Sequence, residues 1–179
     1  MDEQRRNFLL DYYRFEYGIN PEKATFYIDK ETGKELLIAE HLKDDEVFFI
    51  TMGCNGDATQ MEDYKFSCSK AILKDEEGMK LIKEFFHEIT DGIPLYQHFH
   101  FKNDEMEKHF GKAGYTLLFD DDTEPQDLTD NDDNDFMLLV INMVFLTRDD
   151  MDYFDEDEDE DPDEAYYYLQ ENASNYLDR

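Results

Sequence analysis

An α+β fold in a single domain is predicted: a mixed or antiparallel β-sheet flanked by helices, with acidic loops in the C-terminal third. Forty per cent of the 179 residues are hydrophobic, including 15 Phe and 12 Tyr, which is enough apolar surface for a substantial core. Segments with helical periodicity are interspersed with short apolar or alternating runs typical of strands. Acidic residues gather late in the chain, among turn-forming residues.

Three segments carry helix signals. Glu3–Gly18 has apolar residues at roughly helical spacing, and its aromatic stripe is expected to contact the core. Asp75–Gly92 is the clearest helix, with acids in the first turn and Gly92 as a C-cap. Asn103–Gly114 is expected to form a short helix or a turn. The apolar face of the second helix comprises Met79, Ile82, Phe85, Phe86 and Ile89.

The first strands surround a turn. Ala24–Asp29 and Glu35–Leu42 flank residues 30–34 and are expected to pair as a hairpin. Glu46–Gly53 is a continuous apolar run, as in a strand buried on both faces. Asp63–Leu73 alternates. Its two faces carry Tyr64, Phe66 and Cys68 on one side and Lys65, Ser67 and Ser69 on the other.

Three more strands are predicted in the second half of the chain, at Ile93–Phe101, Tyr115–Phe119 and Phe136–Thr147. The last is the most apolar and is expected to be the central strand. Residues 120–135 are polar and acidic, and are expected to form a loop. Arg148–Phe154 then has the composition of a helix start.

The predicted core domain spans residues 1–154, and residues 155–179 form an acidic segment followed by a short aromatic helix packed on the core. Asp155–Glu164 holds nine acids and one proline, and the aromatic segment Ala165–Leu177 follows it. Because apolar residues follow the acids, we expect a loop or helical turn held at both ends. The alternative is a solvated, disordered tail, which is how charge blocks usually behave.

The negative charge is concentrated in one part of the chain. The net charge is −30. Residues 1–119 hold 24 acids and 15 Lys plus Arg, a net of −9, whereas residues 120–179 hold 23 acids and two Arg, a net of −21. Such a chain repels nucleic acid and anionic membranes and attracts cationic proteins. We therefore expect no direct nucleic-acid binding and no membrane binding.

Cysteine content and hydropathy indicate the compartment. Cys54 and Cys68 are the only cysteines, and no apolar signal segment opens the chain. The longest apolar run, Met137–Leu146, is too short to span a bilayer. The sequence therefore predicts a cytoplasmic protein with two reduced thiols.

Signatures of enzymes are absent from the sequence. It contains no phosphate loop, dinucleotide fingerprint, serine elbow or zinc-protease motif. Either cysteine could act as a nucleophile with a histidine as base, although free cysteines are mostly core residues. His98 and His100 are weak metal candidates, since His87 or His109 could supply a third ligand. The acidic runs lack the glycine and glutamate of a calcium loop, and no cofactor is predicted.

The acidic third of the chain predicts a binding function. B-DNA presents one negative charge per about 1.7 Å, and a helix rises about 1.5 Å per residue, so a near-continuous acidic segment can match that charge density. We predict a non-enzymatic inhibitor that blocks a basic surface of a nuclease or another nucleic-acid-acting enzyme. It would be a DNA mimic, serving as a toxin immunity protein or as an anti-defence protein such as an anti-CRISPR or anti-restriction inhibitor. The predicted partner-binding residues are Asp120, Asp121, Asp122, Asp130, Asp132, Asp133, Asp149, Asp150, Asp152, Asp155, Glu156, Asp157, Glu158, Asp159, Glu160, Asp161, Asp163 and Glu164.

Other classes of function stay open at this point. One is a small metal-dependent enzyme built on His98 and His100, which would retain metal after dialysis. Another is a general acidic chaperone, which would bind many basic proteins rather than one. A solubility-conferring acidic face is the interpretation without a partner.

The order of the apolar segments is also informative. It runs VFFITMGCNG, EEGMKLIKEFFHEI, GIPLYQHFHF, YTLLF and FMLLVINMVFLTRDDMDYF, with a helix start at Leu146–Asp150. In this order the chain resembles the suppressor-of-fused-like domain over roughly residues 45–155. The resemblance implies an α+β scaffold that binds protein and has no catalytic residues. Bacterial members are associated with toxin systems as immunity proteins, and eukaryotic members sequester a transcription factor. The acidity of residues 120–135 and 155–164 departs from the family and leaves an unrelated DNA mimic open.

Overall fold

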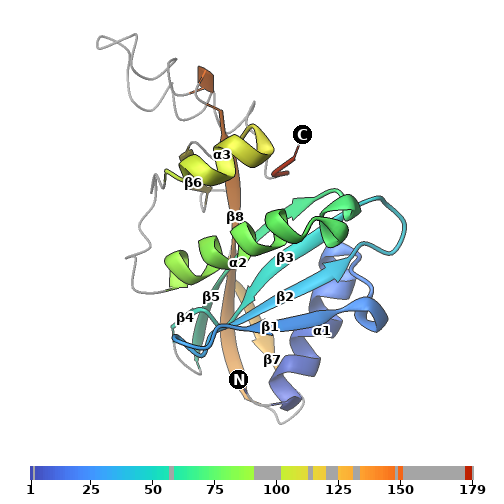
Figure 1. Cartoon of the computed structure of the whole chain (residues 1–179). Coiled ribbons are helices and arrows are strands. Elements are labelled where there is room, and N and C mark those ends of the chain that lie inside the picture. Colours follow the sequence, from blue (N-terminus) through green and yellow to red (C-terminus); the bar gives the residue numbers. More distant parts are fainter. Residues whose placement is uncertain are drawn as a thin grey trace.

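A mixed β-sheet with helices on both faces forms the computed structural model of the chain (Figure 1). The structure describes residues 1, 3–56, 59–90, 102–112, 115–119, 125–130, 134–147, 149–150 and 176–178. The predicted α+β class, with a mixed sheet flanked by helices, is confirmed.

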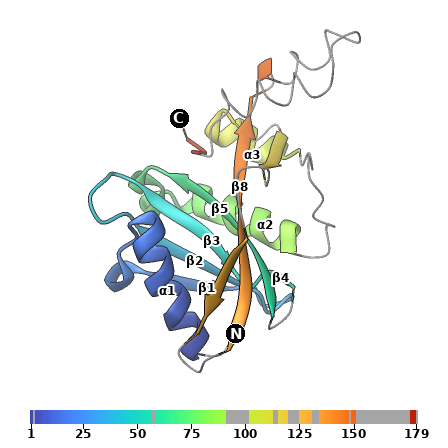
Figure 2. The same cartoon turned by 180° about the vertical axis from the view of Figure 1, so that it is seen from behind.

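Helices and strands do not alternate regularly along the chain. The helices are α1 (Glu3–Tyr17), the 3₁₀ turns η1 (Pro21–Lys23) and η2 (Lys70–Lys74), α2 (Glu76–Thr90) and α3 (Asp104–Phe110). The strands are β1 (Thr25–Ile28), β2 (Glu35–Glu40), β3 (Val47–Met52), β4 (Asn55–Gly56), β5 (Gln60–Cys68), β6 (Tyr115–Phe119), β7 (Gln126–Thr129) and β8 (Asp135–Leu146). Helix α2 covers one face of the sheet and α1 the other, as the reverse view in Figure 2 makes clear.

Strand β8 joins the two halves of the sheet. The strand order is β1-β2-β3-β5-β8-β6, with β4 paired to β5 and β7 paired to β8. Strands β5 and β8 are parallel up to the pair Lys65↔Asn142, and the other described strand pairs are antiparallel. Strand β8 therefore has β5 along one edge and β7 followed by β6 along the other. It is an internal strand but not the predicted central one, because it lies one strand from the edge of the sheet.

Each face of the sheet has its own apolar core. Under α2 the ring of Phe66 stacks on Phe49 at 4.9 Å and meets Phe145 edge-on at 5.2 Å. Under α1, Leu9 and Tyr13 pack on the apolar side chains of β2, β3 and β8. Alternation along the strands supplies both cores at once. In β8, Phe136, Leu138 and Val140 face α1, and Ile141, Met143 and Phe145 face α2.

Side-chain caps fix the helices on the α2 face. Asp75 accepts a hydrogen bond from the Gly78 N–H at 3.0 Å at the start of α2, and the Asn103 side chain accepts one from the Met106 N–H at 2.9 Å at the start of α3. Helix α3 ends at Gly111, whose φ of 74° favours glycine. A helix was predicted at Asp75–Gly92 and a short helix or a turn at Asn103–Gly114; within the described residues, α2 confirms the first and α3 shows that the second is a helix.

The predicted hairpin of β1 and β2 is also confirmed. Asp29 closes its turn, because its Oδ1 accepts hydrogen bonds from the backbone N–H groups of Glu31 (2.9 Å) and Thr32 (2.7 Å). Gly33 completes the turn with a φ of 69°. All six residues of β3 are buried, as predicted for a strand covered on both faces.

Four expectations differ from the structure. The alternating segment predicted at Asp63–Leu73 is a strand only as far as Cys68, because Ser69 caps the 3₁₀ turn η2. Phe15 is 86% exposed rather than part of the core stripe, because α1 rests on the sheet through Leu9 and Tyr13. Residues 120–135 contain strand β7, which is held to β8 by backbone pairing and has little apolar pattern. The described end of the predicted aromatic helix is a β-bridge and a turn at residues 176–178. The predicted strand at 93–101 and the C-cap at Gly92 lie outside the described residues.

Candidate functional site

Most acids predicted to bind a partner lie outside the described residues. Three are described, Asp130, Asp149 and Asp150, and the structure brings the last two together at one helix start. Outside the described residues are Asp120, Asp121, Asp122, Asp132, Asp133, Asp152, Asp155, Glu156, Asp157, Glu158, Asp159, Glu160, Asp161, Asp163 and Glu164.

Asp130 has a role within the fold. Its Oδ2 accepts a hydrogen bond from Arg5 Nη2 at 2.9 Å, which links the turn between β7 and β8 to α1. Its Oδ1 accepts a hydrogen bond from the Asn134 N–H at 3.0 Å. The Asp130 side chain is only 10% exposed. A carboxylate paired in this way offers a partner less free charge than an unpaired one.

Asp149 and Asp150 stand at a helix start directly after β8. The Thr147 N–H donates to Asp150 Oδ2 at 2.7 Å, and the Asp150 N–H donates to Thr147 Oγ1 at 3.2 Å. This reciprocal pair is a capping box. The capping box agrees with the helix start predicted at Arg148–Phe154. Asp150 serves the cap, whereas the Asp149 side chain is exposed.

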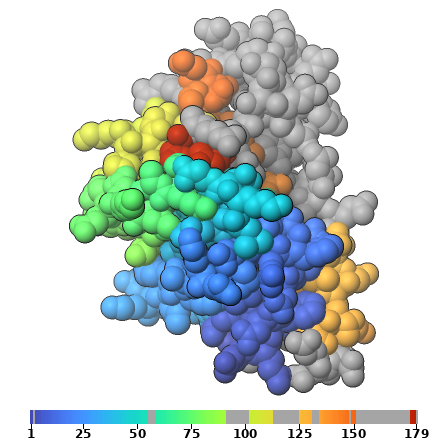
Figure 3. All heavy atoms as spheres, turned by 90° about the vertical axis from the view of Figure 1, so that its right-hand side faces the viewer, coloured from blue at the N-terminus to red at the C-terminus, as the bar shows by residue number. Residues whose placement is uncertain are grey.

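Residues 176–178 are built into the core. Tyr176 forms a parallel bridge with Ser67, and the Leu177 N–H donates to the Ser67 carbonyl at 2.8 Å. Leu177 is fully buried in the core under α2. The side chain of Asp178 accepts a hydrogen bond from the Ser69 N–H at 2.9 Å. The atoms of residues 176–178 that are visible in Figure 3, coloured red, lie beside α3 (yellow).

This docking fills a place in the sheet that β8 leaves free. Strand β5 pairs with β8 only as far as Asn142, beyond which β8 continues alongside β6. Strand β3 holds the other edge of β5 at Ser67, so Tyr176 lies on the β8 side. Among the described residues, pairing with the sheet ends at Leu146 and is found again at Tyr176. The acidic residues 155–164 therefore lie between two points fixed to the sheet.

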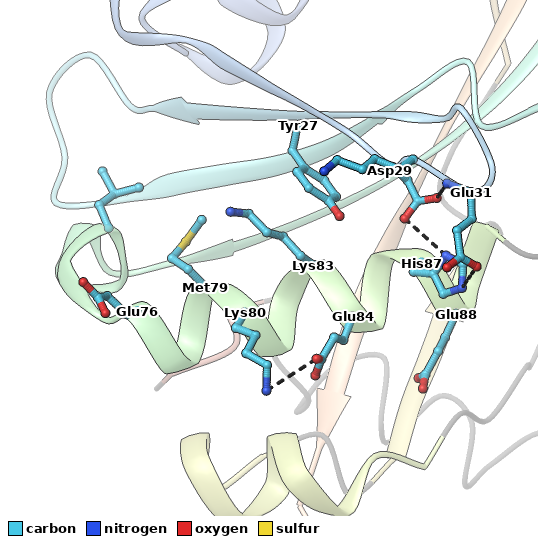
Figure 4. A pocket seen from close by; sticks show the side chains of 12 residues that line it. Tyr27, Asp29, Glu31, Glu76, Met79, Lys80, Lys83, Glu84, His87 and Glu88 are labelled. Atoms are coloured by element: carbon cyan, nitrogen blue, oxygen red, sulfur yellow. Dashed lines mark hydrogen bonds and ion pairs between the residues drawn. The ribbon is translucent and has the colours of Figure 1, made fainter.

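A groove of about 960 Å³ runs between β1 and α2 (Figure 4). Tyr27 and Met79 face each other across it and give it an apolar floor. Lys83 extends along it, with its Nζ 5.2 Å from the ring centre of Tyr27. The charged lining residues are Asp29, Glu31, Glu76, Glu84 and Glu88 against Lys30, Lys80 and Lys83. Five carboxylates against three lysines leave the groove net negative.

His87 lies between two carboxylates at one end of the groove. Its Nδ1 is 3.2 Å from Asp29 Oδ2, and its Nε2 is 3.7 Å from Glu31 Oε2. The Nδ1 contact is not aligned as a hydrogen bond, so the attraction to Asp29 depends on protonation of the imidazole. The hydrogen bond from the Thr32 N–H lowers the pKa of Asp29, which keeps this end of the groove anionic.

The charges along α2 are unevenly balanced. Lys80 Nζ lies 3.5 Å from Glu84 Oε1, so this lysine is partly neutralised within the helix. Partial burial and the neighbouring carboxylates of Glu84 and Glu105 raise the pKa of Glu88. A carboxylate crowded by like charges attracts a cation from outside. The carboxylates of Asp29, Glu31 and Glu88 line the end of the groove nearest the C-terminus of α2.

The metal candidates His98 and His100 lie outside the described residues. The histidines proposed to complete their site each contact a carboxylate: His87 in the groove, and His109 with Nε2 2.6 Å from Asp75 Oδ2. In the described part of the chain, no three metal-binding side chains are grouped suitably for an ion. The predicted three-histidine site stays a prediction.

Both cysteines are buried in the core under α2. Burial raises the pKa of Cys54 to about 12 and also raises the pKa of Cys68 well above its usual value. The thiolate is the nucleophilic form of cysteine. Neither side chain therefore has the exposure or the ionisation of a catalytic nucleophile at neutral pH.

We expect both thiols to resist alkylation in the folded protein. Iodoacetamide at about pH 8 would modify neither cysteine, because the reactive thiolate is scarce and access is blocked. Both would react after unfolding in urea, with mass spectrometry as the readout. Selective labelling of one cysteine in the folded protein would contradict this and would restore a cysteine-based enzyme as a candidate.

Asp63 of β5 is a fully buried carboxyl under α1. Its Oδ1 accepts hydrogen bonds from Thr51 Oγ1 at 2.8 Å and the Cys54 N–H at 3.0 Å, and its Oδ2 accepts one from Tyr13 Oη at 3.1 Å. Burial raises its pKa to about 6, although these bonds and one from the Gly53 N–H act in the opposite direction. One carboxyl group thus links α1, β3 and the turn that follows β3.

Sequence reasoning missed the groove, Asp63 and the way residues 176–178 dock. The groove joins residues 27–31 to residues 73–88, and no local pattern indicates that these segments face each other. The signal available for Asp63 was an acid between Glu62 and Tyr64 in an alternating strand. That pattern is also typical of a solvent-facing position.

Comparisons with protein-family models, with curated proteins and with solved structures found no match. The resemblance to the suppressor-of-fused-like domain stays a prediction. None of the helices in the described ranges combines the length and apolar character needed to cross a bilayer.

Proposed function

We propose that this protein is a non-enzymatic inhibitor whose acidic C-terminal third occupies a basic surface of a nucleic-acid-acting enzyme. The observation that carries the proposal is the placement of charge: residues 120–179 hold 23 acids and two arginines. Carboxylates at this density compete for cationic side chains that otherwise hold phosphates. The same charge opposes binding to nucleic acid itself.

The anchoring of the acidic segment supports the proposal. The capping box at Thr147 and Asp150 lies before it, and the docked residues 176–178 lie after it. Fixing both ends of a segment reduces the conformational entropy that binding would otherwise cost. Acids held on a folded scaffold therefore bind one surface better than the same acids on a free tail.

The inhibitor has two candidate forms. It is a toxin immunity protein if the partner is a cognate toxin, and a DNA-mimicking anti-defence protein if the partner is a CRISPR or restriction nuclease. Both forms meet the partner in the cytoplasm, where buried thiols such as those of Cys54 and Cys68 stay reduced. The identity of the partner separates the two.

Neutralising the acidic segment is expected to weaken salt-sensitive capture of the partner. All nine acids of Asp155–Glu164 are changed to Asn or Gln, and wild type and variant are immobilised as baits for lysate of the source organism. We expect wild type to hold one basic protein stoichiometrically and to release it as salt rises, because salt screens ion pairs. The variant is expected to lose at least about tenfold in affinity, or about 1.4 kcal/mol.

A charge-matched control distinguishes the position of the acids from their number. It neutralises nine exposed acids outside both the acidic segment and the groove, so both variants carry −30 + 9 = −21. The control acids are Glu3, Asp11, Glu16, Glu22, Asp44, Asp45, Glu77, Asp104 and Glu105. Equal losses in the two variants, or no loss in either, would refute the proposal. Capture of many basic proteins would favour the chaperone, and metal retained after dialysis would favour an enzyme using His98 and His100.

A further inference from the structure

We propose that the free edge of β1, together with the groove beside α2, binds an extended lysine- or arginine-rich segment of the partner as an added strand. The basic character of this segment rests on the proposed function. The pairing with β1 rests on the geometry of the sheet alone.

Among the described strands, none pairs with the backbone groups at the outer edge of β1. Strand β1 is the first strand in the sheet order, and no other described strand pairs with it besides β2. The Asp29 N–H donates to the Lys34 carbonyl at 2.9 Å, which fixes the alternation of hydrogen bonds in the hairpin. In an antiparallel ladder every second residue bonds outward. The N–H and C=O groups of Phe26 and Ile28 therefore point away from β2, where a further strand would pair.

The exposed side chains at this edge agree with that geometry. Ile28 is 54% exposed, and Leu73 at the rim of the groove is 42% exposed. A strand added beside Ile28 would cover its side chain. Addition of a peptide strand to a sheet edge derives affinity from backbone hydrogen bonds and specificity from pockets for alternate side chains.

The groove has the length of a short strand. From Glu76 to Glu88, α2 rises about 18 Å at 1.5 Å per residue. An extended chain covers that distance with about five to six residues at 3.3 Å each. Figure 4 shows Tyr27 and Asp29 on the strand side and Met79 and His87 on the helix side of this space. Every second side chain of an added strand would enter it.

The charges of the groove select a cationic occupant. Its five carboxylates outnumber its three lysines, and Lys80 is already paired with Glu84. Glu31 is 83% exposed, and Glu88 is crowded by other carboxylates. A lysine or arginine side chain near Glu31 and Glu88 would relieve this repulsion, whereas an acidic segment would increase it.

The same charges argue against a second copy of this chain as the occupant. Pairing two β1 edges would bring the carboxylates of two grooves together, in two molecules that each carry a net charge of −30. Repulsion between like charges opposes such a dimer.

The test uses two synthetic eight-residue peptides, one alternating Lys with Val and one alternating Glu with Val. In NMR titrations we expect the Lys–Val peptide to shift the amides of β1 and to slow hydrogen exchange at Phe26 and Ile28. Ile28→Pro removes the outward N–H without breaking the ladder to β2, because proline is tolerated at an edge strand. We expect it to weaken peptide binding at least about tenfold, whereas Ile28→Thr, which keeps the N–H, changes it less than about twofold.

A second variant covers the case in which Ile28→Pro does not fold. Glu31→Lys combined with Glu88→Lys reverses two exposed charges at the C-terminal end of the groove, and we expect it to prefer the Glu–Val peptide. Unchanged peptide preference in this variant, equal affinity of Ile28→Pro and wild type, or no binding of the Lys–Val peptide would overturn the inference. So would a wild-type dimer that Ile28→Pro converts to monomer.

The proposed function and the strand addition can be refuted independently of each other. The variant neutralised at 155–164 keeps β1 intact, so it is expected to bind the Lys–Val peptide at β1 as wild type does. If the acidic segment proves irrelevant to capture while the peptide still binds β1, only the proposed function fails. If neutralisation weakens capture while the peptide ignores β1, only the strand addition fails.

Discussion

Replacing Asp63 with alanine is expected to lower the free energy of unfolding by about 2–4 kcal/mol at neutral pH. The substitution leaves the Thr51 hydroxyl, the Cys54 N–H and the Tyr13 hydroxyl without their acceptor in a site from which water is excluded. It also opens a cavity between α1 and the sheet. Urea unfolding followed by circular dichroism measures the change, with wild type and variant compared at one pH.

The Asp63 carboxyl also makes stability depend on pH. Its pKa of about 6 in the folded protein exceeds the ordinary value of 3.8, so the folded state holds the proton more tightly than the unfolded state does. This stabilising contribution is complete below about pH 4 and is lost as pH rises through 6. Asp63→Asn has no such proton. Between pH 4 and 7 the stability of wild type is therefore expected to fall by about 2–3 kcal/mol relative to Asp63→Asn.

The comparison of Asp63→Asn with wild type removes the effect of the other carboxylates, because both chains share them. Parallel stability curves for the two proteins between pH 4 and 7 would show that Asp63 does not titrate in this range. A steeper fall for Asp63→Asn than for wild type would reverse the expected sign.

Replacing Leu177 with alanine is expected to cost about 2–4 kcal/mol of stability and to release residues 176–178 from β5. The side chain of Leu177 is fully buried under α2, so its loss leaves a cavity at the place where the chain returns to the sheet. Urea unfolding measures the stability. Hydrogen exchange of the Leu177 amide, which donates to the Ser67 carbonyl, reports the release.

Leu73→Ala is the matched control for this prediction, since Leu73 is 42% exposed. We expect it to change stability by less than about 0.5 kcal/mol. Amides at the β2–β3 pairing are expected to keep their protection in Leu177→Ala. Equal costs at both leucines, or an unchanged exchange rate at the Leu177 amide, would contradict the assigned anchor.

The parts of the fold predicted from sequence are those in which a local pattern decides the structure. In α2, five apolar residues at helical spacing and acids in the first turn agree with each other, and the helix begins at Glu76, one residue after the predicted start at Asp75. The β1–β2 hairpin was equally local, because Asp29 and Gly33 specify its turn. Backbone pairing without apolar alternation explains why β7 was expected to be a loop.

The candidate sites depend on contacts between distant segments, which local patterns do not report. Tyr13 and Asp63 are fifty residues apart, and their hydrogen bond depends on which face of the sheet α1 covers. For the same reason the burial of Ser67 was not predicted. Ser67 alternates with core residues along β5, as a surface residue would, but its side chain is buried on the opposite face of the strand. The acidity of residues 120–179 needed no structure, because it is a property of composition.

Strand β1, the proposed docking edge, and strand β8, which precedes the acidic segment along the chain, lie toward opposite edges of the sheet. Strand β1 is four places from β8 in the strand order, which corresponds to about 19 Å at about 4.8 Å per strand. A partner of ordinary size spans that distance. Two weak contacts on one partner raise the affinity of both through effective concentration. Loss of one contact would then weaken capture of the partner, while the other contact would still form.

The position of β8 inside the sheet bears on how the chain folds during synthesis. Its parallel neighbour β5 ends at Cys68, and β8 ends at Leu146, 78 residues later. At about 5–20 residues per second the ribosome needs roughly 4 to 16 s to add them. Throughout that interval β1, β2, β3 and β5 can form a sheet in which one edge of β5 is open. The nascent chain is thus most vulnerable to misassembly at the strand that later holds both β8 and residues 176–178.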